Sequence, residues 1–212
     1  MATASVDTRT IILAAARSRL LTDGYAGLST RKVADEAGVP LSQLHYHFGS
    51  KGRLILELLA TENQQRLERQ SRMYAEARPL WQRYEQACDF LEDDLDSGYV
   101  RVLQEMIAAG WSNQEIGDAV RELLSGWFVL LIEVAKEAEQ RYGPLGPFTA
   151  EELGMLVGTA FIGSEALLLL GFEGSLMPIR PALRRIGVLI RELEEGSARA
   201  PEAEDASVRT ER

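Results

Sequence analysis

Apolar residues recur at helical spacing along most of the chain, and no stretch shows the sustained apolar–polar alternation of a half-buried strand. The N-terminal part contains three short helical patterns, each followed by a glycine. We predict a first helix from Asp7, as N-cap, to about Asp23, a second from Ser29 to Gly38, and a third over 41–47. The chain is therefore predicted to be all-α.

Local signals for helix starts and stops support these three helices. Ser29 is flanked by Leu28 and Val33 at the two positions of a hydrophobic staple, and Gly38 supplies a left-handed stop. A short turn through Pro40 then leads directly into the third helix. Two short helices joined by a tight turn, with another helix before them, predict an N-terminal helix-turn-helix.

Longer helical patterns follow, interrupted by glycine, proline and serine. They predict helices over about 50–77, 80–96, 99–110, 113–142, 149–170 and 178–195. From residue 197 the chain is rich in alanine, glutamate and arginine and has no apolar periodicity. We predict a helix-turn-helix DNA-binding domain over 1–52, a helical effector-binding and dimerisation domain over 53–196, and a disordered tail over 197–212.

Charge is distributed unevenly along the chain. The formal net charge is -9, but residues 1–60 carry +2 and the remainder carries -11. The acidic total taken alone argues against a nucleic-acid partner. The uneven distribution instead predicts a basic N-terminal part that can face phosphates and an acidic remainder that avoids them.

Cysteine usage and the N-terminal sequence favour a cytoplasmic protein. Cys88 is the single cysteine, which excludes an intramolecular disulfide, and residues 1–10 lack a basic segment followed by an apolar one. The nearly apolar stretch 154–172 approaches the length of a membrane span, but Glu165 and four glycines interrupt it. We interpret this stretch as a buried or interface helix and expect no membrane partner.

The third predicted helix has an apolar side and a polar side. At about 100° per residue, Leu44 and Phe48 share the side that must pack on the first two helices. The remaining surface carries hydroxyl, amide, phenol and imidazole groups, supplied by Ser42, Gln43, His45, Tyr46 and His47. Such groups can meet base edges and phosphates, so this helix is the predicted reader of double-stranded DNA.

The segment from Leu28 to Lys51 resembles the DNA-binding signature of the TetR-like repressor family. Its sequence is LSTRKVADEAGVPLSQLHYHFGSK, and the preceding Asp23-Gly24-Tyr25 and the following Leu54 match as well. The resemblance covers roughly residues 7–56, whereas the remainder resembles the family in length and helix content. It implies a transcriptional regulator, in the simplest case a dimeric repressor that a small-molecule effector releases from DNA.

The resemblance also implies roles for individual residues. Arg31 would reach a base or a phosphate. Base edges would be approached by Leu41, Ser42, Gln43 and His45, and the DNA backbone would be held by Thr30, Tyr46, His47 and Lys51. Two positions depart from the family pattern, because His45 stands where tyrosine is usual and Gly52-Arg53 replaces the commoner acidic pair.

Many aromatic and sulfur-containing side chains lie in the predicted helical body. Each taken alone is more often a core residue than a ligand contact. Together they can form apolar walls between helices, and the resemblance implies a small-molecule site of this kind. The candidates for binding a mostly apolar effector are Trp81, Tyr84, Cys88, Leu103, Met106, Ile107, Trp111, Trp127, Phe128 and Phe161.

The last two predicted helices favour a homodimer. Gly154, Gly158 and Gly163 would let a partner helix approach closely, and 167–170 extend the apolar surface. Packing of the same glycines within one chain is the alternative. Two such helices from each subunit would form a four-helix interface and place two recognition helices on a pseudo-palindromic operator.

An all-helical enzyme and a helical protein-interaction module that binds no DNA remain as alternatives. The chain contains no HExxH, P-loop or Gly-x-Ser-x-Gly motif, although Glu165 in an apolar helix could be a perturbed base. His45 and His47 point about 200° apart on their helix, so they are poorly placed to share a metal. We expect no catalytic residue, no metal site and no cofactor.

Overall fold

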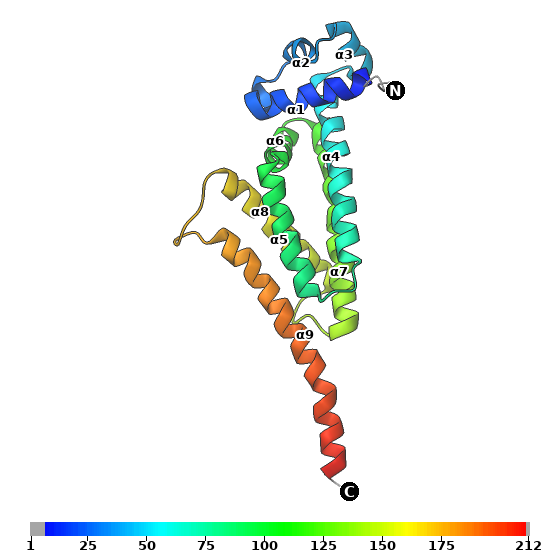
Figure 1. Ribbon diagram of the computed structural model, residues 1–212, viewed down its shortest axis with the longest axis vertical. Helices are drawn as coiled ribbons and strands as arrows, with labels where there is room; N and C mark the ends of the chain where they lie inside the picture. Colours follow the sequence, from blue (N-terminus) through cyan, green and yellow to red (C-terminus); the bar gives the residue numbers. More distant parts are fainter. Residues whose placement is uncertain (1–6, 211–212) are drawn as a thin grey trace, which may run out of the picture. The chain divides into compact units, whose positions relative to one another are not determined.

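The computed structural model describes residues 7–210, with side chains up to residue 196, and this part of the chain contains helices and no strand (Figure 1). The all-α prediction is confirmed. The helices are α1 (Thr8–Gly27), α2 (Thr30–Ala37), α3 (Leu41–Phe48), α4 (Lys51–Tyr74), α5 (Leu80–Asp96), α6 (Tyr99–Gly110), α7 (Gln114–Tyr142), α8 (Ala150–Leu169) and α9 (Ile179–Thr210). Up to α8, the predicted ends differ from these by a few residues.

The helices form two compact units. The first comprises the chain up to Arg66 together with Asp94–Leu124, and the second comprises Leu67–Asp93 together with the chain from Ser125 onward. This division differs from the predicted boundary at residue 52. The difference arises because α4, α5 and α7 each contribute residues to both units.

Helices α1, α2 and α3 pack around a small apolar core in the first unit. Its buried side chains are Ile12, Ala15, Ala16, Leu20, Val33, Ala34, Leu44 and Phe48. The regular helix of α1 is interrupted at Gly24, with φ 69° and ψ 171°, where the sequence predicted its end. Asp7 precedes α1 as predicted, but its side chain makes no capping hydrogen bond, which corrects its expected role.

Helix α6 fixes the end of α1 within the first unit. The Glu105 carboxylate accepts the backbone N–H of Tyr25, and Arg101 Nη1 donates to the Leu21 carbonyl at 2.9 Å. A side chain at Gly98, which has φ 79°, would collide with Leu21. The Glu105 carboxylate therefore holds the backbone after the α1 interruption, while Leu21 before it packs closely on Gly98 at the start of α6.

Glycines of α8 bring this helix close to α7 in the second unit. A Cβ at Gly154 would lie 2.9 Å from both the backbone N and the Cα of Ile132, and a Cβ at Gly158 would fall on the ring of Phe128. A Cβ at Gly163 would meet nothing within 4 Å. Gly154 and Gly158 therefore serve packing inside the chain, which was the alternative interpretation, and only Gly163 keeps an open side.

The core of the second unit lies among α4, α5, α7 and α8. It contains Met73, Tyr74, Leu80, Ala87, Leu131, Ala135, Ala138, Leu145 and Ala150. Glu194 of α9 caps α5, because its carboxylate accepts the N–H of Leu80 at 2.7 Å and the hydroxyl of Tyr142 at 2.5 Å. These two bonds tie α9 to α5 and to the end of α7.

Helix α8 is long and apolar, and helix α9 extends further than the sequence predicted. Helix α8 has the length and composition of a membrane span, with 28% of its most apolar window buried, and one such helix is weak evidence for a membrane protein. Helix α9 continues to Thr210, through most of the segment for which a disordered tail was predicted. Alanine, glutamate and arginine in that segment favour helix locally, and 211–212 lie outside the described residues.

Candidate nucleic-acid interface

Helix α3 presents the polar side that its sequence predicted. Leu44 is 0% and Phe48 4% exposed, so both side chains turn into the core of the first unit, whereas Tyr46 is 86% exposed. Ser42, Gln43 and His45 are exposed with Tyr46. Leu41 is 37% exposed, so its apolar side chain is available to a thymine methyl.

Helix α2 and its turn hold α3 in place. The hydroxyl of Ser29 accepts the N–H of Lys32 at 3.3 Å, as an N-cap does, and Gly38 adopts the left-handed conformation with φ 66° and ψ 29°. Thr30 and Arg31 occupy the first turn of α2, where Arg31 is exposed and Thr30 is half-buried. The side chain of Arg31 is thus accessible to a phosphate.

The end of α3 is closed by bonds between His45 and Gly49. Gly49 N–H donates to the His45 carbonyl at 2.9 Å, and His45 Nδ1 lies 2.9 Å from the Gly49 carbonyl oxygen. The neighbouring His47 is half-buried, with its ring 5.3 Å from the ring of Tyr46 and 6.1 Å from that of Phe48. His47 is therefore held more by ring packing than His45 is.

Lys51 has an internal partner that the sequence did not reveal. Its ammonium donates to the Tyr25 carbonyl at 3.0 Å and lies 4.3 Å from the centroid of the Tyr25 ring. Burial raises the pKa of Tyr25. Since an ammonium has three donors, one bond to Tyr25 leaves others for a phosphate, and the contact of Lys51 with the DNA backbone stays a prediction.

Charge is positive around α3 although the chain is acidic. No aspartate or glutamate occurs between Ala37 and Leu56. Three carboxylates in or next to the three-helix part are paired with bases: Glu36 with Arg19, Glu57 with Arg9, and Asp23 with Lys32. Pairing of these carboxylates reduces the repulsion that a phosphate backbone would meet.

Sequence comparison identifies the domain type of the N-terminal part of the chain. Residues 12–58 match the family model described as "Bacterial regulatory proteins, tetR family". This segment is therefore a TetR-type DNA-binding domain. The match covers most of α1, all of α2 and α3, and the start of α4, which confirms the resemblance found in the sequence. No curated protein sequence matches the chain.

Solved structures with the same fold extend this likeness beyond the TetR-type domain. FadR from Bacillus subtilis in complex with stearoyl-CoA has a TM-score of 0.70 at 16% identity, covering 84% of this chain and 96% of its own. Reduced NemR from E. coli has a TM-score of 0.69 at 14% identity, covering 86% of this chain and 95% of its own. A transcriptional regulator from Saccharomonospora viridis in complex with choline has a TM-score of 0.69 at 23% identity, covering 84% of this chain and 93% of its own. At these identities the likeness shows the fold alone.

The predicted effector-binding residues are divided between the two units. Leu103 and Met106 are buried in the first unit, where Ile107 is half-buried and Trp111 is 84% exposed. The other six, all in the second unit, are Trp81, Tyr84, Cys88, Trp127, Phe128 and Phe161. Within that unit the ring of Phe161 lies 5.9 Å from the ring of Tyr84 and 6.2 Å from that of Trp127.

A small apolar cavity of about 90 Å³ lies in the second unit. Of the predicted residues only Tyr84 lines it, together with Tyr74, Leu80, Leu131, Val134, Ala135, Ala138, Leu145, Leu153, Gly154, Val157, Ile190 and Leu193. The sequence could not single out these aliphatic residues, because they follow the same periodicity as any core position. The Tyr84 hydroxyl donates to the Leu183 carbonyl at 2.9 Å, so this polar group is already engaged.

Cys88 lies beside Tyr84 and is buried. Burial raises the pKa of the Cys88 thiol to about 11. Because the thiolate is the nucleophile and the metal ligand, this environment makes Cys88 unreactive. Among the described residues no cluster of three histidine, cysteine, aspartate or glutamate side chains is arranged to hold a metal ion.

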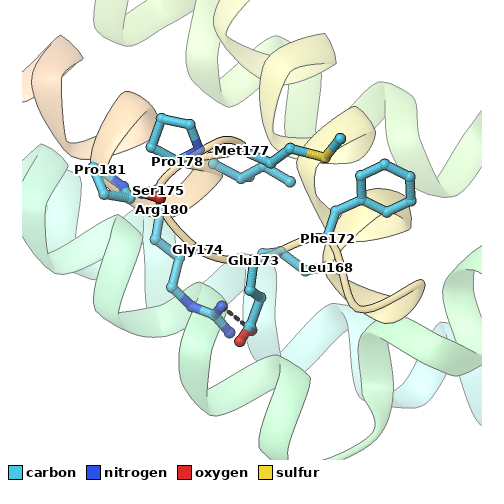
Figure 2. Close-up of a pocket in the computed structure, with 10 residues that line it drawn as sticks. Leu168, Phe172, Glu173, Gly174, Ser175, Met177, Pro178, Arg180 and Pro181 are labelled. Carbon is cyan, nitrogen blue, oxygen red and sulfur yellow. Dashed lines mark hydrogen bonds and ion pairs between the residues drawn. The ribbon is translucent and has the colours of Figure 1, made fainter.

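A second hollow, of about 380 Å³, lies at the turn between α8 and α9 (Figure 2). Figure 2 shows Arg180 meeting Glu173, and Arg180 Nε also contacts the Glu92 carboxylate at 2.9 and 3.0 Å. Phe172 and Met177 supply apolar walls. Since the guanidinium is matched by two carboxylates, this hollow offers little free charge to a ligand.

Proposed function

We propose that this TetR-like regulator is a cytoplasmic homodimer that represses transcription by placing α3 in the major groove of a pseudo-palindromic operator. The observation that carries the proposal is the exposed polar side of α3 above a fully buried Leu44, within a stretch that has no acidic residue. Gln43 and His45 would meet base edges, while Arg31 and Lys51 would meet phosphates.

The dimer part of the proposal rests on an exposed apolar surface of α8 and α9. Its large side chains are Met155, Leu156, Leu167, Leu169, Leu170, Val188 and Leu189, which are between 40% and 74% exposed. A soluble chain rarely leaves so much apolar surface uncovered. A dimer is also needed because one short helix-turn-helix contacts only half of an operator site. A monomer in light scattering at micromolar concentration would contradict the dimer.

The effector part rests on the apolar cavity of the second unit. FadR of Bacillus subtilis and the Saccharomonospora viridis regulator were solved with stearoyl-CoA and choline, which differ widely in chemistry. They support a small-molecule effector without choosing one. At about 90 Å³ the cavity is smaller than the roughly 300 Å³ of typical ligand sites, so a mostly apolar effector must push the lining helices apart.

This expansion supplies a mechanism for release. Helix α4 begins directly after the helix-turn-helix and contributes residues to both units. Displacement of α4 in each subunit would therefore move the helix-turn-helix and change the spacing of the two α3 helices. A coupling of about 1 to 3 kcal/mol would change DNA affinity roughly 5- to 150-fold. Apolar metabolites that bind in calorimetry should therefore weaken operator binding.

The experiment recovers bound fragments from sheared genomic DNA with the full-length protein and then measures affinity by fluorescence anisotropy. We expect Lys51→Ala to weaken binding to operator and random duplexes alike and to lower the salt slope by about one. We expect Gln43→Ala to change the preference at particular base pairs. Equal effects of both variants on operator and random DNA would contradict the proposed division of roles.

A further inference from the structure

The imidazole of His45 is held in one orientation by the backbone at the end of α3. Its Nδ1 lies 2.9 Å from the Gly49 carbonyl oxygen, while the Gly49 N–H donates to the His45 carbonyl at 2.9 Å. Gly49 has φ 71° and ψ -58°, a conformation that favours glycine. The two bonds join the same two residues, so the ring is fixed at an exposed position of the recognition helix.

This bond also decides which ring nitrogen carries the proton. A carbonyl oxygen can only accept a hydrogen bond, so Nδ1 must donate. In a neutral imidazole one nitrogen donates and the other accepts, and the bond made by the first sets the role of the second. Nε2 of neutral His45 is therefore an acceptor.

A fixed acceptor selects its partners on DNA. Phosphate oxygens, guanine N7 and O6, and thymine O4 are acceptors themselves and cannot pair with Nε2. In the major groove the donors are the N6 amino group of adenine and the N4 amino group of cytosine. We propose that His45 selects an amino base, adenine or cytosine, over guanine or thymine at one position of each half-site, an inference that rests on the proposed DNA-binding function.

The test selects duplexes from a randomised library with the full-length protein and with His45→Asn, in buffer alkaline enough to keep imidazole neutral. An asparagine carboxamide can still donate to the Gly49 carbonyl, but it has no atom at the place of Nε2. For wild type we expect adenine or cytosine to be favoured about 2- to 10-fold at one position per half-site, as one hydrogen bond allows. His45→Asn should lose this preference and keep the others.

A second measurement does not depend on the variant's folding. On the selected duplex, the base at that position is replaced by an analogue without the exocyclic amino group: purine for adenine, or 2-pyrimidinone for cytosine. Wild-type affinity should fall by the same factor, whereas His45→Asn, or His45→Ala if the asparagine variant unfolds, should not respond. Gln43→Ala is the matched control and should remain sensitive to the analogue.

Three results would overturn the inference. They are a wild-type preference for guanine or thymine at the position that responds to His45, an unchanged preference in both His45 variants, and equal wild-type affinity for every analogue duplex. Failure of the wild-type protein to bind any duplex would instead refute the proposed function. Base preferences that are present but independent of His45 would refute this inference alone.

Discussion

The packing of α8 on α7 can be tested with two glycine-to-alanine substitutions in the same helix. At Gly154 a new Cβ would lie 2.9 Å from the backbone N and Cα of Ile132, which cannot move without shifting α7. At Gly163 a new Cβ meets nothing within 4 Å. Both variants gain roughly 0.5 to 1 kcal/mol because alanine favours helix over glycine. This common gain cancels when the two variants are compared.

The difference between the variants therefore isolates the packing cost. Overpacking of a tight contact costs about 1 to 3 kcal/mol, so Gly154→Ala should be less stable than Gly163→Ala by that amount, and its Tm should be lower by about 2 to 4 °C for each kcal/mol. Urea unfolding followed by circular dichroism measures the free energy of unfolding. Equal stability of the two variants would show that α8 and α7 are not in backbone contact at Gly154.

The protein concentration separates this effect from dimerisation. If Gly163 lies in the dimer interface, the stability of Gly163→Ala relative to wild type should change with protein concentration. The loss in Gly154→Ala should not change, because its cause lies within one chain. A loss in Gly154→Ala that appears only at high protein concentration, where the dimer forms, would instead show that this glycine faces a partner helix.

Four further predictions concern Cys88, Glu105 and Tyr84. Cys88 in the native protein should react with iodoacetamide at neutral pH at least roughly 100-fold more slowly than in the unfolded chain. The reason is that raising the pKa of the thiol from 9.0 to about 11 lowers the thiolate fraction by that factor. A native rate near the unfolded rate would contradict the burial of Cys88. Because this folded-state pKa is raised, its contribution to stability is complete below pH 9.0 and is lost as the pH rises towards about 11, which urea unfolding across that range checks. Glu105→Ala should reduce stability by about 1 to 3 kcal/mol and speed hydrogen exchange at the Tyr25 amide, whose acceptor it removes; unchanged exchange there would refute this contact. Tyr84→Phe should cost about 0.5 to 1.5 kcal/mol through the lost bond to Leu183, measured by urea unfolding, and a variant as stable as wild type would show that water replaces that bond.

Local chemistry made the DNA-reading part predictable. Ser29 and Gly38 act as caps within a few residues of the helix ends that they define, so their roles could be inferred without the rest of the fold. The partner of Gly154 could not be inferred in this way. A small residue on an apolar helix permits close approach from either side, and only the fold shows that Ile132 of the same chain occupies that space.

The lining of the apolar cavity in the second unit could not be predicted from the sequence either. Aromatic and sulfur-containing side chains stand out in a sequence, yet the cavity is lined mainly by aliphatic residues that any helical core contains. The bond from Lys51 to Tyr25 could not be predicted from the local sequence either, because Tyr25 lies on another helix. Sequence patterns fix what each helix offers, whereas the identity of the facing side chain depends on how the helices pack.

Specificity of α3 depends on how freely each exposed polar group can choose its role. The hydroxyls of Ser42 and Tyr46 can donate or accept, so each can adapt to more than one base pair, whereas the carboxamide of Gln43 favours a base that offers a donor beside an acceptor. His45 differs because the Gly49 carbonyl already holds its donor. Adaptable groups add affinity on many sequences, but discrimination requires that a wrong base leave a group unpaired. His45 is the exposed side chain of α3 for which the protein itself imposes that penalty, so its variants should change operator preference more than overall affinity.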